Sequence, residues 1–229
     1  MRRPVPELRV HPTQYCYAGD ADPSATGGIA AIYSDLAADA TRTAQVAADV
    51  AEALARGRHC LVLTSRIGHL DRLTHTLREY GCNPVVLRGG MGAKARSAAL
   101  AQLQPDPAGP PLLVIATGPY IGEGFDCPAL DTLFLAAPIA FKGRLVQYAG
   151  RIMRSYAGKT TAEIHDYHDR HTGVLAASLA KRAPGYISLG FPDPRRLPLT
   201  PSANHSPAPA SHQPGIGKGT SERQSLSRP

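Results

Sequence analysis

Short apolar runs alternate with stretches of helical periodicity through the middle of the chain. The apolar runs have the length of buried strands. They predict strands at residues 60–64, 84–88, 112–116, 132–137 and 161–167. Between them, apolar residues recur three and four positions apart, which is the pattern of an amphipathic helix. These stretches predict helices at residues 34–57, 69–81, 93–103, 147–154 and 172–182. Gly57 and Gly81 stand where two of these helices should end.

Apolar strands that alternate with helices indicate a parallel sheet covered by helices on both faces. The predicted fold class is therefore α/β, with three layers. In such sheets, ligands bind at the loops that follow the carboxyl ends of the strands. The residues directly after each strand are thus where we expect the chemistry.

Composition divides the chain into three parts. Residues 1–30 are rich in Pro, Gly and Asp, and we expect an entry segment rather than a domain. Residues 31–190 hold the periodic patterns and should form one domain with a core. Residues 191–229 are dominated by Pro, Ser and short polar residues, so we expect a disordered tail.

The composition of the whole chain limits the classes of function. Its formal net charge of +7 is compatible with a nucleic-acid partner but does not establish one. The four cysteines form no CxxC pair, which favours reduced thiols in a cytoplasmic protein. No run of about 18 apolar residues occurs, so no membrane span is expected, and the first residues lack the apolar stretch of a secretory signal.

Small hydroxyls, glycines and basic side chains follow several of the predicted strands. Hydroxyls, backbone N–H groups and helix N-termini commonly bind phosphate. The candidate contacts to a nucleic-acid backbone are Ser65, Arg66, Gly90, Lys94, Arg96, Thr117 and Gly118. Simpler explanations stay open. Ser65 could cap the next helix, Gly90 could form a tight turn, and Lys94 and Arg96 could lie on a solvated helix face.

The segment "GEGFDCP" (residues 122–128) carries a denser pattern. Two glycines flank Glu123, and glycine permits a close approach of the backbone to a ligand. Asp126 could accept hydrogen bonds from a sugar hydroxyl. The alternative is that Asp126 only stabilises its own turn.

The segment "QYAGRIMR" (residues 147–154) should lie on a helix. At about 100° per residue, one polar stripe collects Gln147, Gly150, Arg151 and Arg154, and apolar residues occupy the other side. Gly150 costs about 1 kcal/mol of helix stability relative to Ala, which suggests that something packs close to this stripe. A solvated amphipathic helix is the alternative.

A third polar segment, "HDYHDRH" (residues 165–171), clusters three His and two Asp. Metal binding is conceivable from these residue types. A polar strand end that leads into a helix explains the same residues, and we assign no metal ligand.

The order of "CLVLTSR", "LRGGM", "IATGPYIGEGFDCPALDTLFLAAP" and "QYAGRIMR" resembles motifs IV, IVa, V and VI of superfamily 2 helicases. Within that superfamily it is similar to the DEAD/DEAH branch, close to type III restriction-like translocases. The resemblance is to their second, C-terminal motor lobe, and runs from about residue 31 to residue 190. It implies a three-layer RecA-like parallel sheet.

The resemblance also implies roles for the matched residues. Arg151 and Arg154 would reach the terminal phosphates of ATP and offset charge during phosphoryl transfer, and Gln147 would help to orient that site. The nucleotide-binding residues so implied are Gly124, Asp126 and Gly150. The seven residues after the strands would contact the nucleic-acid backbone.

Half of the expected machinery is missing from this sequence. The first lobe of such a helicase carries a G-x-x-x-x-G-K-[ST] phosphate loop and an acidic motif that holds Mg²⁺. Neither is present, and "GIGKGT" (residues 215–220) has the wrong spacing and no Ser or Thr directly after its Lys. ATP would therefore be shared with an N-terminal lobe, which would hold the Mg²⁺. We expect the chain to begin near the joint between the lobes, at "VPELRVHP".

Three hypotheses follow. The first is the second motor lobe of an ATP-dependent DNA helicase or translocase, inactive alone, whose partners are double-stranded DNA and an N-terminal lobe. DNA is favoured because "GEGFD" resembles double-stranded DNA translocases. The second is a non-catalytic nucleic-acid-binding module that kept the fold. The third is an unrelated α/β enzyme, such as a transferase, whose arginine helix binds a sugar nucleotide.

Overall fold

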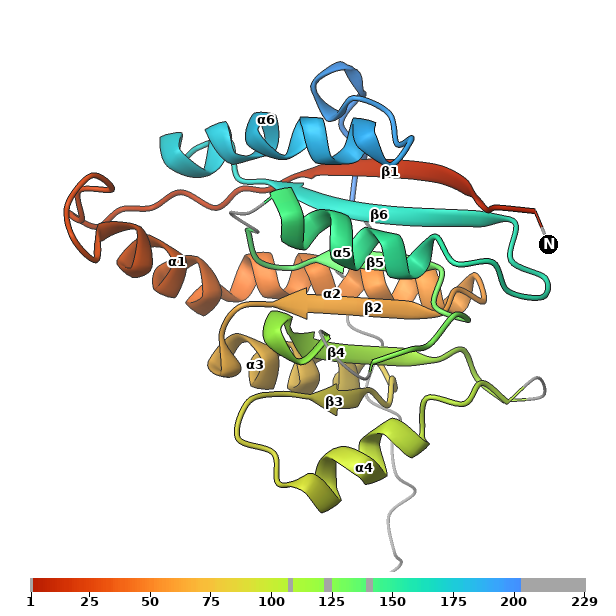
Figure 1. Cartoon of the computed structure of the whole chain (residues 1–229). Coiled ribbons are helices and arrows are strands. Elements are labelled where there is room, and N and C mark those ends of the chain that lie inside the picture. Colours follow the sequence, from red (N-terminus) through yellow and green to blue (C-terminus); the bar gives the residue numbers. More distant parts are fainter. Residues whose placement is uncertain (1, 107–108, 122–124, 139–141, 203–229) are drawn as a thin grey trace, which may run out of the picture.

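A computed structural model of the 229-residue chain describes residues 2–106, 109–121, 125–138 and 142–202. Within these residues, six strands form one parallel sheet in the order β1-β6-β5-β2-β4-β3 (Figure 1). The strands are β1 (Val5–Pro12), β2 (Cys60–Thr64), β3 (Val85–Leu87), β4 (Leu113–Thr117), β5 (Thr132–Leu135) and β6 (Thr161–His168). The predicted parallel α/β sheet is confirmed.

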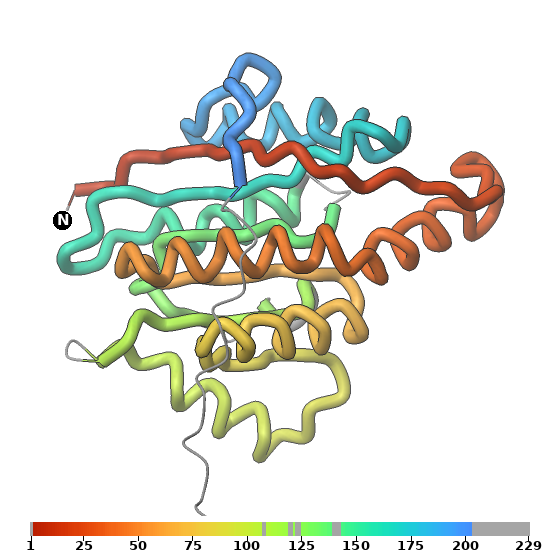
Figure 2. The backbone as a smooth tube through the Cα atoms, turned by 180° about the vertical axis from the view of Figure 1, so that it is seen from behind, coloured from red at the N-terminus to blue at the C-terminus, as the bar shows by residue number. Residues whose placement is uncertain are grey.

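Helices cover both faces of the sheet, as the sequence predicted. They are α1 (Gly28–Ala38), α2 (Ala40–Ala55), α3 (Ile67–Glu79), α4 (Ala93–Ala101), α5 (Lys142–Ile152) and α6 (Gly173–Ser188), with 3-10 turns η1 (Gly118–Ile121) and η2 (Pro194–Arg196). Figures 1 and 2 show α4, α5 and α6 on one face and α2 and α3 on the other, while α1 extends beyond the carboxyl ends of the strands. Among the described residues, no helix is long and apolar enough to cross a membrane.

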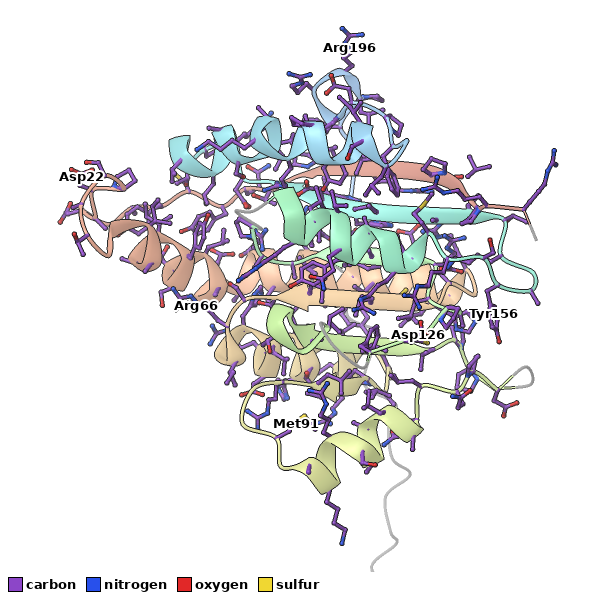
Figure 3. All side chains as sticks on the ribbon, viewed as in Figure 1. Asp22, Arg66, Met91, Asp126, Tyr156 and Arg196 are labelled. Carbon is purple, nitrogen blue, oxygen red and sulfur yellow. The ribbon has the colours of Figure 1, made fainter. Side chains whose placement is uncertain are left out.

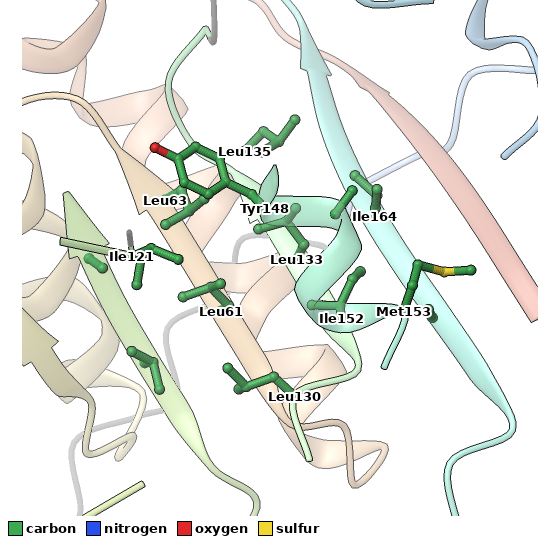
Figure 4. Packing of buried hydrophobic residues seen from close by; sticks show 14 of the residues in the cluster. Leu61, Leu63, Ile121, Leu130, Leu133, Leu135, Tyr148, Ile152, Met153 and Ile164 are labelled. Atoms are coloured by element: carbon green, nitrogen blue, oxygen red, sulfur yellow. The ribbon is translucent and has the colours of Figure 1, made fainter. Parts of the chain in front are cut away.

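The core lies on both sides of the central strands because successive side chains of a strand point to opposite faces. Leu61 and Leu63 of β2 pack under α5, whereas Val62 packs under α2 and α3. Figure 4 shows the first cluster, in which Tyr148 and Ile152 of α5 lie over the leucines of β2 and β5. Burial of one such side chain contributes about 1.5–3 kcal/mol, so α5 is firmly attached to the sheet.

The single helix predicted over residues 34–57 is two helices, α1 and α2. The break falls at Asp39, whose backbone is extended and whose carboxylate accepts a hydrogen bond from the Arg42 amide at 2.6 Å. Asp is a favoured N-cap residue because its side chain satisfies a free amide of the first turn. Gly57 and Gly81 follow α2 and α3 with φ of +79° and +76°, which confirms both predicted helix ends.

The chain before α1 contributes strand β1 to the sheet. We expected only an entry segment over residues 1–30, without a strand. Strand β1 pairs with β6 from Val5↔Thr161 to Pro12↔His168. Only one short alternation, "LRV", marked it in the sequence, because an edge strand with one buried face has few apolar residues. Its Leu8 and Val10 belong to the main core cluster.

The expectation of disorder from residue 191 onward is wrong for residues 191–202. Phe191 is buried and packs edge-on against Tyr186 of α6, with ring centroids 6.3 Å apart. Leu199 forms a parallel bridge with Val10, and the Thr200 amide donates to the Val10 carbonyl at 2.7 Å. This segment is ordered by docking on β1 and α6, which its own polar composition cannot reveal. Residues 203–229 lie outside the described residues.

Candidate functional site

Helix α5 has one buried apolar face and one more exposed polar face, as predicted. Leu145, Tyr148 and Ile152 are buried in the core, whereas Gln147 is exposed and Arg151 is half-buried. The helix ends at Ile152, so Arg154 lies two residues beyond it. The Arg154 amide still bonds to the Arg151 carbonyl at 3.3 Å, which keeps the two arginines on the same side.

Both arginines contact the loop that joins β4 to β5. Arg151 donates from Nη1 to the Phe125 carbonyl oxygen, and its guanidinium lies 5.7 Å from the centre of the Phe125 ring. Arg154 forms an ion pair with the Asp126 carboxylate. The side chains of Arg154 and Asp126 are 48% and 61% exposed, so water reaches this pair from outside. The helix stripe therefore faces the "GEGFDCP" segment; Gly124 itself lies outside the described residues.

The site carries an excess of positive charge. Among the described residues here, two guanidiniums adjoin one carboxylate, which leaves a local balance of +1. Burial lowers the pKa of Arg151, the neighbouring Arg154 charge lowers it further, and Asp126 opposes the shift. An arginine placed beside another arginine at a partly exposed position creates a potential that attracts anions.

The loop that carries Phe125 and Asp126 is held from behind. Lys159 Nζ donates to the Pro128 carbonyl at 3.0 Å and to the Leu130 carbonyl at 2.5 Å. Burial lowers the pKa of Lys159 to about 8, and the Asp131 charge opposes this shift. No sequence pattern pointed to Lys159, because its partners are backbone carbonyls some thirty positions away.

The surroundings of two glycines at the site differ in whether they leave room for a side chain. A Cβ atom at Gly118 would lie 2.6 Å from the Tyr148 hydroxyl oxygen, so any larger residue would force this buried tyrosine of α5 to shift. A Cβ atom at Gly150 would meet nothing within 4 Å among the described residues. Packing within this part of the chain therefore does not explain Gly150, although the sequence suggested a close neighbour.

The remaining candidates lie at the carboxyl ends of β2 and β4. Ser65 is exposed and does not cap α3, since Arg66 is its N-cap residue. Arg66 donates from Nη2 to the Ala30 carbonyl at 2.6 Å and so ties α3 to α1. Thr117 is only 5% exposed, and Gly118 is half-buried. Ser65 and Arg66 are thus better placed than Thr117 to contact a ligand.

The turn after β3 supplies the last candidates. Gly90 has a φ of +77°, so the tight-turn explanation for this glycine holds. Gly92 is the N-cap residue of α4 and offers no side-chain cap. Lys94 is exposed in the first turn of α4, and Arg96 is half-buried.

The structure places the candidates at two edges of the sheet instead of one. Ser65, Gly90 and Gly118 follow strand ends and lie at the carboxyl edge. Helix α5 runs back across the sheet, and its 11 residues span about 16 Å. The chain after Asp126 reaches the amino edge, where the Asp131 amide bonds to the His59 carbonyl at 3.0 Å. Figure 3 shows Arg66 and Met91 toward the strand tips and Asp126 toward the strand starts.

Most of the first part of the "HDYHDRH" segment is buried, whereas Arg170 and His171 at its end are exposed. His165 bonds to Glu163 at 2.8 Å and to His11 at 2.9 Å. Asp166 holds Arg182 of α6 through two hydrogen bonds of 2.8 Å. Asp169 holds Arg42 of α2 at 2.7 and 3.2 Å. These contacts join α2 and α6 to β6, a structural role that the sequence pattern did not reveal.

The charged side chains at the amino edge of the sheet fit one side of a nucleotide. Guanidiniums suit phosphate oxygens, and the Asp126 carboxylate suits a ribose hydroxyl. The groups that would surround the phosphates from the other side, a phosphate loop with its Lys, are not in the sequence. The residues present therefore fit part of an ATP site.

Neither a protein-family model nor a curated protein sequence matches the chain. Solved structures do. UvsW of T4 matches with a TM-score of 0.57 and 13% identity, over 82% of this chain and 40% of that one. A chain in the complex of the E. coli DEAD-box protein SrmB with regulator of ribonuclease activity A matches with a TM-score of 0.53 and 17% identity. The match covers 94% of this chain and 99% of that one. The DNA-bound Type ISP restriction-modification enzyme LlaBIII matches with a TM-score of 0.50 and 16% identity. The match covers 71% of this chain and 12% of that one.

These likenesses show the fold. The chain has a helicase-like RecA fold, and the RecA-like sheet predicted from the motif order is confirmed. The chain spans less than half the length of the UvsW chain and about an eighth of the LlaBIII chain.

Proposed function

We propose that the chain is the second motor lobe of an ATP-dependent DNA helicase or translocase. One observation carries the proposal. Arg151 and Arg154 stand together beside Asp126, on the exposed side of α5, in a helicase-like RecA fold. Two adjacent arginines with a partly exposed ion pair suit a site that meets the phosphates of a nucleotide.

The nucleotide is held by an N-terminal lobe and meets this chain at the amino edge of the sheet. ATP, when bound there, supplies the phosphoryl transfer that drives the motor. Arg151 and Arg154 would offer their guanidiniums to the phosphate oxygens of that nucleotide, and Asp126 would accept a hydrogen bond from a ribose hydroxyl. Gln147, exposed one turn before Arg151, helps to orient the same groups.

The carboxyl edge of the sheet meets the nucleic acid, which we propose is double-stranded DNA. Ser65 and Arg66 after β2, and Gly90, Lys94 and Arg96 around the start of α4, contact backbone phosphates. Thr117 and Gly118 support this surface from within. The proposal includes a cytoplasmic location, in keeping with the four free cysteines.

ATP hydrolysis by the purified chain and by mixtures tests the proposal. The chain alone should show no DNA-stimulated ATPase, because it lacks a phosphate loop. Mixed with a lobe that carries one and comes from the same gene neighbourhood, it should restore the activity. Arg151→Gln should then lower the rate by about a thousandfold or more. Lys181→Gln, which removes an exposed charge from α6, serves as the control. Robust ATPase by the chain alone that needs Arg151 would contradict the proposal.

The second candidate function is a non-catalytic nucleic-acid-binding module. The missing phosphate loop favours it. In that case the chain binds DNA with strongly salt-dependent affinity, Arg66→Gln weakens binding, and no mixture restores ATPase.

A further inference from the structure

Lys159 joins two loops that lie far apart in the chain. It stands between α5 and β6, and its ammonium group contacts the segment that runs from β4 to β5. Figure 3 shows Asp126 of one loop and Tyr156 of the other toward the same edge of the sheet. The Lys159 amide donates to the Tyr156 carbonyl at 3.2 Å, and Gly158 between them has a φ of +77°. A tight turn therefore fixes where the lysine side chain begins.

The segment that Lys159 contacts is a second tight turn, formed by residues 127–130. The Leu130 amide donates to the Cys127 carbonyl at 3.2 Å, and both residues are buried. A turn with buried residues needs partners for its backbone carbonyls inside the protein. One ammonium group serves two of them, those of Pro128 and Leu130. A charged donor makes a hydrogen bond about twice as strong as a neutral one, so this hold on the turn is strong.

The same turn follows directly on the residues that the two arginines contact. Phe125 is buried in the core and its carbonyl accepts from Arg151, while Asp126 pairs with Arg154. The ring of Phe125 anchors the chain before Asp126, and the turn anchors the chain after it. The backbone at Asp126 is thus set from both sides, and loss of the ammonium group would release one of the two anchors.

We propose that Lys159 is a positioning residue for the site formed by Arg151 and Arg154. It acts through the backbone of the turn, and so sets where the Phe125 carbonyl and the Asp126 carboxylate stand against the two guanidiniums. Its effect on these groups belongs to the chain alone. Its effect on ATP turnover rests on the motor function proposed above.

The charge of Lys159 makes this positioning sensitive to pH. Burial lowers its pKa to about 8, Asp131 and Cys127 oppose the shift, and the Arg58 charge adds to it. Above that pH the neutral amine still has hydrogens to donate, but it lacks the charge that strengthens both bonds. The hold on the turn should therefore weaken as the pH rises through about 8.

An NMR titration of the full chain from about pH 6 to about pH 10 tests the positioning. The side-chain carbons of Lys159 should titrate with a midpoint near pH 8. The carbonyl carbon of Phe125 and the carboxyl carbon of Asp126 should shift with the same midpoint. Lys159→Arg keeps a charged donor that stays protonated in this range, so both shifts should disappear. Lys181→Arg, exposed on α6, is the matched control and should leave them unchanged.

The proposal is overturned if the Phe125 and Asp126 resonances ignore the titration of Lys159, or if their shifts persist in Lys159→Arg. This result does not involve ATP, so it decides the positioning whether or not any mixture hydrolyses ATP. A mixture without ATPase activity would count against the motor function alone.

ATPase activity of a reconstituted mixture tests the consequence for turnover. Lys159→Met keeps the apolar stem and removes the ammonium group, so kcat/KM for ATP should fall about three- to tenfold, the value of one hydrogen bond. Lys181→Met should have no effect, and Lys159→Arg should restore the rate. The parent mixture should lose activity as the pH rises through about 8, whereas the Lys159→Arg mixture should not. If Lys159→Met does not fold, the pH profiles of the parent and Lys159→Arg still decide, and identical profiles would contradict the role in turnover.

Discussion

Two pairs of arginines in this molecule have opposite surroundings. Arg42 and Arg182 are 2% and 4% exposed, and each binds both oxygens of a buried Asp. Arg151 on α5 and Arg154 just beyond it lie at the surface, where Arg151 contacts the Phe125 carbonyl and Arg154 the exposed Asp126 carboxylate. The buried pair fixes helices to the sheet, whereas the surface pair lies where water and anions can reach its guanidiniums.

The surroundings of an arginine decide whether its guanidinium is held in the fold or remains accessible to a ligand. A bidentate pair inside the protein has no alternative partner, so its geometry is set when the chain folds. An exposed pair competes with water and with any incoming anion at all times. The predictions below test whether these two pairs differ in energy as they differ in environment.

Arg182→Met should give the largest loss of stability. It leaves Asp166 buried with Tyr186 as its remaining partner, at 2.7 Å, and breaking a buried pair from one side costs about 3–5 kcal/mol. Urea unfolding at pH 7 measures the change. The comparison fails if Arg154→Gln destabilises the chain by a similar amount.

Acid should destabilise the fold through its buried histidines at a pH well above the range in which carboxylates titrate. Burial, with the charges of Arg42 and Arg72, lowers the pKa of His69 from 6.5 to about 3. The unfolded chain takes up a proton below about pH 6.5 and the folded chain does not, so stability falls as the pH falls. His69 alone accounts for a loss of about 2 kcal/mol between pH 7 and pH 5.

His11 acts in the same direction, because burial lowers its pKa to about 4. Glu163 contributes outside this window. Burial tends to raise its pKa, but the hydrogen bond and charge interaction with His165, the hydrogen bond from Arg56 and the Arg9 charge outweigh burial and lower the pKa to about 2, so its stabilisation is lost only below about pH 4.5. His69→Gln should flatten the slope between pH 7 and pH 5. His75→Gln, an exposed position on the same helix, should leave it unchanged.

Gly150→Ala should raise stability by about 0.5–1 kcal/mol, because alanine favours a helix and the added Cβ meets no neighbour. Gly143→Ala, also on α5 and also with open space around it, should raise stability similarly. The two variants should differ in function. Only Gly150→Ala should lower the ATPase of a reconstituted mixture, since only Gly150 lies beside Arg151. Equal activity of the two variants would contradict a place for Gly150 and Arg151 at the interface between the lobes.

Arg154→Gln should have the smallest effect on folding, below about 1 kcal/mol, because its partner is exposed. A double-mutant cycle with Asp126→Asn measures the coupling directly. It should be a few tenths of a kcal/mol and should vanish at high salt. Strong coupling at 1 M salt would mean that the pair is structural.

The sequence predicted the central sheet well because buried parallel strands read as apolar runs. Residues 60–64 and 161–167 were located almost to the residue, as β2 and β6. Strand β1 was missed because it lies at the edge, where the alternation of one buried face is short. The break at Asp39 was missed because an apolar stripe continues across it, and only the cap geometry interrupts the helix.

The candidate site was predicted in part. Motif order brought Arg154 and Asp126 together as neighbours of one site, and the structure places them in contact. Spacing along the chain could not show that α5 carries the arginines to the opposite edge from Ser65. Nor could it distinguish Arg151 from Arg182, since both are arginines on amphipathic helices. The partners that separate them come from other strands and loops.

The segment after α6 also covers part of a sheet edge that would otherwise be open. Through Leu199 and Thr200 it occupies the outer edge of β1, and Ser202 continues the attachment by bonding to Gln45 at 2.6 Å and to Asp49 at 3.0 Å. An uncovered edge strand presents a row of amides and carbonyls on which a second molecule can add a strand. A chain shortened at residue 190, where composition alone ends the domain, would expose that row and gain a route to aggregation. The contacts of Leu199, Thr200 and Ser202 thus cover part of a sheet edge, a role that the polar, proline-rich composition of their segment does not reveal.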